Sequence, residues 1–136
     1  MHTLSSYTFP DDVLKKILVQ QNYVSQKDWE QAIEYARTND DYVSFYFINR
    51  NILTKDLYGQ AVAEHFKMPY IDFDAYPVLE KNLELLDKEL AHEYRLMVVS
   101  HTKKKVMLAT DTPEQIDYNT LLASHFPDQE IVIGYA

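Results

Sequence analysis

The chain has 136 residues, 46% of them hydrophobic, no cysteine and a formal net charge of −8. A chain of this length and composition can bury one modest hydrophobic core or two small ones. The acidic balance argues against nucleic acid or an anionic membrane surface as the main partner, because either would repel the chain. The lack of cysteine excludes a disulfide framework and thiolate chemistry.

The N-terminal residues MHTLSSYTFP do not show the positive charge followed by an apolar run that marks a signal peptide. No apolar run approaches the roughly 20 residues that a membrane helix needs. These observations predict a cytoplasmic chain with no direct membrane insertion, in which residues 1–10 form an N-terminal extension.

The chain nearly repeats itself. The segment NYVSQKDWEQAI at 22–33 corresponds to NILTKDLYGQAV at 51–62, which is 29 positions later. A repeat this short corresponds to one supersecondary unit. We therefore predict a helical subdomain over residues 11–67, built from one helix–turn–helix used twice.

The second helix of each repeat carries apolar residues at the i, i+3, i+4 and i+7 spacing of one buried face. These residues are Trp29, Ala32, Ile33 and Ala36, and then Tyr58, Ala61, Val62 and His65. Ser25 and Thr54 lie just before these helices, where a hydroxyl can accept from a free backbone N–H. Asn22 and Asn51 lie where the preceding helix must stop, and asparagine tolerates the left-handed conformation of a helix end.

Residues 68–136 have a different pattern. Pro69 and Pro77 bracket an extended stretch, and Asp87 is placed to cap a helix that runs through Tyr94. RLMVVS (95–100) and KVMLAT (105–110) predict a hairpin, the segment after it predicts a helix start with Pro113 in the first turn, and EIVIGYA predicts a final strand. The β-α-β-β-α-β order predicts an α+β fold in which the helices pack on one face of a small sheet.

The sequence offers little catalytic chemistry. With only two glycines, Gly59 and Gly134, neither a Walker A loop nor a dinucleotide-binding fingerprint can be present. The five histidines never have the i, i+4 spacing of a helical metal site. We therefore expect no catalytic residue, no metal and no cofactor in this chain.

The repeat and the segments after it resemble a known family, the N-terminal, MshE-type domain of type II secretion and type IV pilus assembly ATPases. The family pattern is two copies of an R-L-G motif that leads into L-x-x-A-L-x-x-Q, followed by short proline-containing motifs. The resemblance covers residues 11–136 and rests on Ile17 and Leu18, Tyr23 and Val24, Trp29, Ala32 and Ile33, and the ranges 69–73, 94–99 and 108–113.

By resemblance, the repeated motif would hold cyclic di-GMP. The positions here that match the motif are Val13, Leu14, Lys15, Asn22 and Ala36 in the first copy, and Tyr42, Val43, Ser44, Asn51 and His65 in the second. The motif arginines are absent, and the planar fork of arginine has no equivalent in valine or tyrosine. Lys15, Lys16 and Arg50 remain as candidate phosphate contacts.

The resemblance implies one of two functions. The first, which the missing arginines favour, is a non-catalytic domain that docks an assembly ATPase onto a cytoplasmic platform or adaptor protein in protein transport or pilus assembly. Such a partner would bring the chain to the inner face of the bacterial inner membrane. The alternative is a cyclic di-GMP sensor with a diverged motif.

Overall fold

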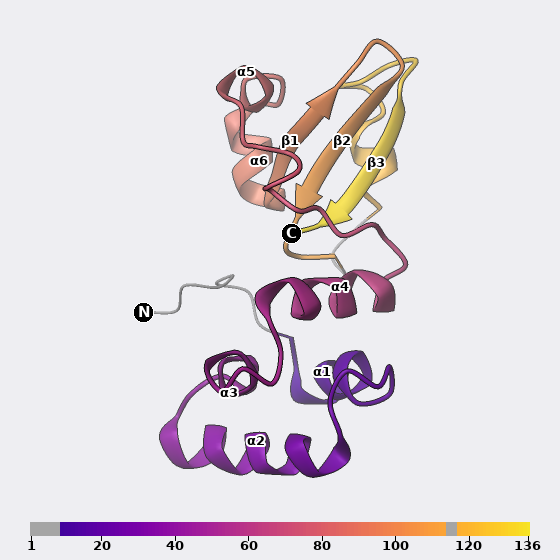
Figure 1. The fold of residues 1–136 in the computed structure, drawn as a ribbon. Coiled ribbons are helices and arrows are strands. Elements are labelled where there is room, and N and C mark those ends of the chain that lie inside the picture. Colours follow the sequence, from indigo (N-terminus) through magenta and orange to yellow (C-terminus); the bar gives the residue numbers. More distant parts are fainter. Residues whose placement is uncertain (1–8, 114–116) are drawn as a thin grey trace. The chain divides into compact units, whose positions relative to one another are not determined.

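The computed structural model describes residues 9–113 and 117–136 (Figure 1). It divides between His65 and Phe66 into two compact units, an N-terminal unit and a C-terminal unit. The first is helical and the second holds a sheet, so the α+β class predicted from the sequence is confirmed. Within the described ranges, no helix has the length and apolar character needed to cross a membrane.

The N-terminal unit has four helices: α1 (Asp11–Leu18), α2 (Gln26–Asn39), α3 (Val43–Asn49) and α4 (Lys55–His65). They form the two predicted helix–turn–helix repeats, α1 with α2 and α3 with α4 (Figure 1). The repeats interleave, because α1 packs on α4 and α2 packs on α3. Each helix of one repeat is therefore covered by a helix of the other.

The turns of the two repeats have the same backbone conformation. Asn22 has a φ of 66° and Asn51 a φ of 59°, so both adopt the left-handed conformation predicted for them. The carbonyl of Leu18 accepts the N–H groups of the two residues that follow Asn22, at 2.8 and 3.1 Å. The carbonyl of Phe47 accepts the N–H groups of the two residues that follow Asn51, at 2.9 and 3.2 Å. The asparagines therefore lie in the turn that follows the first helix of each repeat.

The predicted helix caps are also present. The Ser25 hydroxyl accepts the Asp28 N–H at 3.1 Å, and the Thr54 hydroxyl accepts the Leu57 N–H at 3.0 Å. Each hydroxyl satisfies one of the backbone donors that a helix N-terminus leaves free. The local signals of the repeat therefore act the same way in both copies.

A substitution at Asn51 tests its conformational role. Asn51→Ala is expected to lower the free energy of unfolding by about 1–2 kcal/mol, because alanine lacks the short polar side chain that lets asparagine adopt a positive φ, whereas Asn51→Gly is expected to change it by only a few tenths. Urea unfolding followed by tryptophan fluorescence measures both. Asn49→Ala is the matched control, because Asn49 is an exposed residue inside α3. Equal losses at positions 49 and 51 would contradict this role.

The C-terminal unit holds strands β1 (Leu96–His101), β2 (Lys105–Thr110) and β3 (Glu130–Tyr135), with helices α5 (Glu80–Leu83), α6 (Lys88–Tyr94) and α7 (Tyr118–Leu122). The strand order is β1-β2-β3, with β1 antiparallel to β2 and β2 parallel to β3. The predicted hairpin, the helix capped by Asp87 and the final strand are confirmed.

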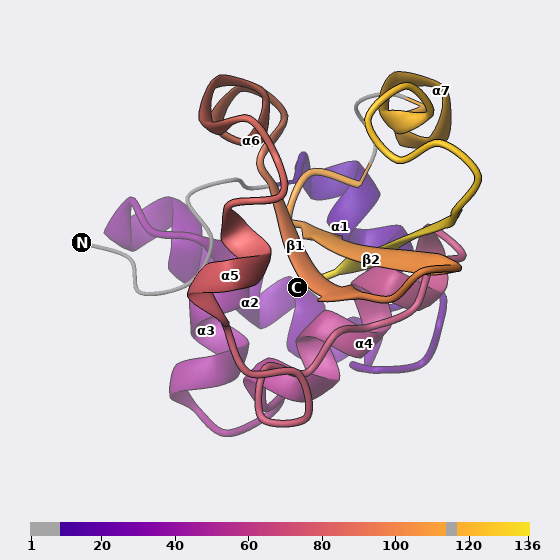
Figure 2. The same cartoon turned by 90° about the horizontal axis from the view of Figure 1, so that it is seen from above.

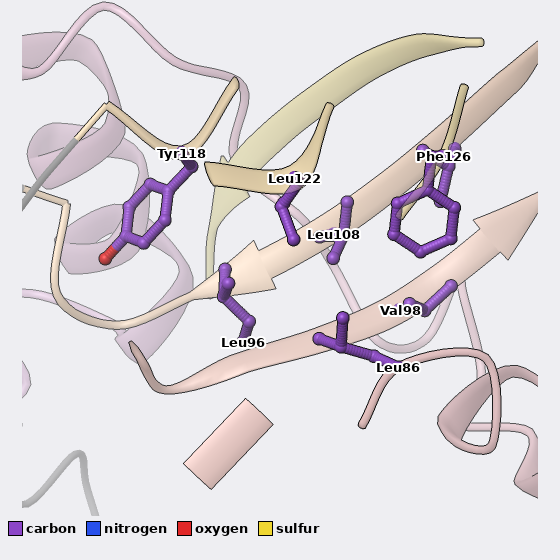
Figure 3. Packing of buried hydrophobic residues seen from close by; sticks show 8 residues of the cluster. Leu86, Leu96, Val98, Leu108, Tyr118, Leu122 and Phe126 are labelled. Carbon is purple, nitrogen blue, oxygen red and sulfur yellow. The ribbon is translucent and has the colours of Figure 1, made fainter. Parts of the chain in front are cut away.

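The core of the C-terminal unit lies between the sheet and helices α6 and α7, which cover the same face of the sheet (Figure 2). Its buried side chains come from β1, β2, α7 and the residues beside the helices: Leu86, Leu96, Val98, Val106, Leu108, Tyr118, Leu122 and Phe126 (Figure 3). Ile71, Val99 and Ala109 form a smaller cluster, to which Met97 and Met107 contribute.

Two sequence predictions for this unit need correction. The strand predicted at 69–77 is wrong: Tyr70 makes a single parallel bridge with Tyr135, and the chain then turns. The turn forms because the Asp72 side chain accepts the Asp74 N–H at 2.9 Å, and the Asp72 carbonyl accepts the Tyr76 N–H at 2.9 Å. The β-α-β-β-α-β order is not confirmed, because two helices, α5 and α6, follow the bridge.

The helix predicted to start near Pro113 begins later. Helix α7 starts at Tyr118, and Asp117 caps it by accepting the Thr120 N–H and hydroxyl. These two hydrogen bonds lower the pKa of Asp117. Ile116, expected to supply an apolar contact, lies outside the described residues, as do residues 1–8 of the expected N-terminal extension.

Candidate functional site

Half of the ten positions that match the family's nucleotide motif come together in the N-terminal unit. They line a small hollow between α1, the end of α2 and the start of α3, with a volume of about 140 Å³: Leu14, Ala36, Tyr42, Val43 and Ser44. The hollow is also lined by Phe9, Tyr58 and two carboxylates, Asp11 and Asp41. No lysine or arginine lines it.

This hollow is poorly suited to a bis-phosphate ligand. Its volume lies below the 300–1,000 Å³ that is typical of small-molecule sites. Asp11 and Asp41 bring negative charge to its wall, which repels phosphate. Val43 and Ser44 are buried at the start of α3, so their side chains are committed to packing.

The other motif positions lie elsewhere. Val13 and Lys15 are half-buried on α1, Asn22 and Asn51 form the turns, and His65 is the last residue of α4. The structure does not bring them into the hollow. Five of the ten motif positions therefore share one hollow, and the other five lie outside it.

The three candidate phosphate contacts do not line the hollow either. Lys15 and Lys16 are in the last turn of α1, where positive charge complements the helix dipole. The Arg50 guanidinium lies over the rings of Tyr46 and Tyr35, at 4.4 and 4.8 Å from the ring centroids. Such cation–π contacts stabilise an arginine in place. Arg50 therefore links α2 and α3.

Tyr58 in the wall of the hollow gives a pH-dependent prediction. Burial raises the pKa of Tyr58 to about 12, because the phenolate would lose hydration. Since the pKa is higher in the folded chain than in the unfolded chain, this contribution to stability is present below pH 10 and is lost as the pH rises from 10 towards 12. Tyr58→Phe is expected to remove that loss, which we place at about 2 kcal/mol. Urea unfolding of both proteins between pH 9 and 12 measures the difference.

Tyr76→Phe is the control for this titration, because Tyr76 is an exposed tyrosine of the C-terminal unit. If the wild-type chain and the Tyr58→Phe variant lose stability in parallel above pH 10, the titration of Tyr58 does not cause the loss.

A second surface, in the C-terminal unit, was not found from the sequence. Among the described residues, seven large apolar side chains are exposed, and six of these lie between positions 73 and 85: Phe73, Tyr76, Val78, Leu79, Leu83 and Leu85. Helices α5 and α6 and strand β1 enclose a groove of about 770 Å³, which we call the α5–α6 groove, and of these six side chains Leu83 lines it. Leu83, Leu86, Leu96, Met97 and Val98 form its apolar wall.

The α5–α6 groove has an acidic rim. Glu80, Glu84 and Asp87 line it, together with one lysine, Lys88. The sequence did contain a signal for this surface. The segment VLEKNLELL at 78–86 holds more leucine and valine than a four-residue helix can bury. This excess of apolar residues is the signal. A search for helical or strand periodicity misses it, because the segment is too short to show either pattern.

No group of three or more histidine, aspartate or glutamate side chains is arranged to bind a metal ion within residues 9–113 and 117–136. A smaller hollow of about 330 Å³ contains Arg95 and Asp111, which pair through two hydrogen bonds of 2.5 Å. This pairing raises the pKa of Arg95. The pair connects the end of α6 to the end of β2, which is a structural role.

Comparison with known proteins supports the resemblance seen in the sequence. No protein-family model matches the chain. The chain is similar to the type IV pilus assembly ATPase PilB of Acinetobacter baylyi (strain ATCC 33305 / BD413 / ADP1), with 23% identity over 116 residues. The match covers 84% of this chain and 20% of PilB, so the chain spans about a fifth of the length of that relative.

Two solved structures also match. MshE, solved with cdg (cyclic di-GMP), matches with a TM-score of 0.59 and 21% identity, over 90% of this chain and 88% of the MshE chain. The N-terminal domain of XpsE matches with a TM-score of 0.40 and 12% identity, over 99% of this chain and 90% of the XpsE chain. The chain is thus similar in sequence to PilB and shares the fold of MshE, in agreement with the resemblance to assembly ATPases.

Proposed function

We propose that this chain is a non-catalytic docking and regulatory domain of a type II secretion or type IV pilus assembly ATPase. It binds a cytoplasmic platform or adaptor protein and so brings the ATPase to the inner face of the bacterial inner membrane. The observation that carries this proposal is that six large apolar side chains between Phe73 and Leu85 are exposed. Exposed apolar patches of this kind mark protein contacts.

The similarity to PilB and MshE indicates the type of machine in which the chain acts. The exposed apolar side chains indicate that it acts by binding another protein. The hollow at the motif positions, in contrast, is small and acidic. Of the two surfaces, the one in the C-terminal unit has the character of a binding surface. Protein docking is therefore favoured over nucleotide binding.

Direct binding measurements test the proposal. The full chain is immobilised and titrated with the purified cytoplasmic domains of the platform and adaptor proteins from the pilus and secretion machines of its source organism. We expect saturable binding by one of them at concentrations below about 100 μM, which includes the range of transient complexes. An unrelated acidic protein of similar size controls for adsorption by charge. If no domain binds more than this control, the proposal fails.

A cyclic di-GMP sensor is the second candidate, and the observation in its favour is the fold match to MshE solved with cdg. Calorimetric titration of the chain with cyclic di-GMP tests it, and we expect no saturable heat because the motif arginines are absent. If heat appears, Lys15→Ala should abolish it under this alternative. Lys27→Ala, which removes an exposed lysine from α2, should leave it unchanged.

A further inference from the structure

The α5–α6 groove has the features of a binding site for one class of partner. We infer that it receives a basic amphipathic helix from a protein partner, whose apolar side chains enter the groove while its lysines or arginines face the acidic rim. This inference rests on the docking function proposed above and specifies the surface and the chemistry of the partner.

The dimensions and lining of the groove support a helix as the occupant. Its volume of about 770 Å³ is large enough for several apolar side chains. Helices that bind in grooves insert side chains from i, i+3 or i+4, and i+7 along one apolar face. Leu83 stands exposed at the mouth of the groove, and Leu86 and Val98 are buried within its wall. The wall is thus mainly apolar, as an apolar helix face requires.

Charge determines the second property of the partner. The lining of the groove holds three carboxylates, from Glu80, Glu84 and Asp87, against one lysine, Lys88, and one histidine, His92. An acidic helix would be repelled by this rim, whereas a basic helix would be attracted to it and bind faster. The partner segment is therefore basic.

The edge of the sheet argues against an extended peptide. β1 is an edge strand, and a free edge can accept an added strand. Here α5 packs on β1, and the buried side chain of Asn82 donates to the Val99 carbonyl at 3.4 Å. This edge is therefore partly covered, and the groove beside it is the open surface.

The test uses the full chain and a fluorescently labelled synthetic peptide of 18 residues, made of leucine and lysine in the pattern of an amphipathic helix. Two peptides serve as controls: one has glutamate in place of lysine, and the other has the same composition in an order without an apolar face. We expect saturable binding of the first peptide only, with NMR shift changes confined to residues 79–98. Equal binding of the scrambled peptide would overturn the inference.

Matched variants separate the groove from general attraction to an acidic chain. Leu83→Gln is expected to weaken binding of the peptide about fivefold to tenfold, whereas Leu57→Gln, at an equally exposed leucine on α4, should leave it unchanged. Glu84→Lys should weaken binding by a similar factor, and Glu30→Lys, which makes the same change in net charge on α2, should not. Equal effects within either pair would overturn the inference.

The same variants distinguish this inference from the proposed function. If a platform domain binds the chain and Leu83→Gln leaves that affinity unchanged, docking stands and the groove is not its site. If the peptide binds in the groove and no platform domain binds, the docking function fails. NMR shift changes limited to the edge of β1 would indicate that the peptide adds as a strand. Sedimentation of the chain alone that depends on concentration, and no longer does so in Leu83→Gln, would indicate that a second copy of the chain occupies the groove. Either result would replace the basic helix as the occupant.

Discussion

Phe47→Ala is expected to lower the free energy of unfolding of the N-terminal unit by about 3–5 kcal/mol. The Phe47 side chain is fully buried, stacks on Trp29 at 6.4 Å between ring centroids and meets the Tyr46 ring edge-on at 5.7 Å. Removing it leaves a cavity between α2 and α3, which the surrounding side chains can fill only in part. Because small domains have a total stability of about 5–15 kcal/mol, this loss brings the unit close to unfolding.

Urea unfolding measures the effect directly, because Trp29 is the single tryptophan of the chain and reports on this unit. Leu57→Ala is the control, since the Leu57 side chain is 41% exposed and its loss should cost no more than about 0.5 kcal/mol. Leu18→Ala makes the corresponding change in the first repeat. The Leu18 side chain is also fully buried, and its carbonyl accepts two turn hydrogen bonds, as the carbonyl of Phe47 does. A loss below 1 kcal/mol for Phe47→Ala would contradict its central position.

The second large effect is expected at Gly134 in β3, where Gly134→Ala should destabilise the C-terminal unit by about 1–3 kcal/mol. A Cβ added there would lie 2.5 Å from Cδ1 and 2.6 Å from Cγ1 of Ile71, and 2.9 Å from the carbonyl oxygen of Pro69. Ile71 is buried, and the Pro69 carbonyl accepts the Tyr135 N–H at 2.8 Å. Neither neighbour can move without losing a contact, so the glycine is required by close approach.

A double-mutant cycle tests this cause. In an Ile71→Ala background the two closest atoms are absent, so Gly134→Ala should cost less there than in the wild-type chain. Urea unfolding followed by circular dichroism gives the four free energies. If the two substitutions are additive, the contact with Ile71 is not the source of the destabilisation.

The parts of the fold that were predicted correctly depend on local chemistry. The left-handed asparagines at 22 and 51 and the hydroxyl caps at 25 and 54 each act within a few residues along the chain, and each occurs twice. The hairpin was predicted because two β-branched runs flank a short polar turn. In these segments the sequence alone holds the information that determines the structure.

The parts that were missed depend on neighbours far along the chain. The stretch at 69–77 has strand-like residues, but the Asp72 side chain stabilises a turn, and only Tyr70 reaches β3 to make a bridge. The crowding at Gly134 is invisible in the sequence, because Ile71 is more than sixty positions away. The α5–α6 groove is formed by two short helices and a strand, so its residues were not recognised as one surface.

The interleaved packing of the N-terminal unit bears on whether one repeat can fold by itself. Because α1 is covered by α4 and α2 by α3, a single helix–turn–helix repeat would expose the apolar faces of both its helices. The two repeats therefore depend on each other, and we expect neither of them to fold alone.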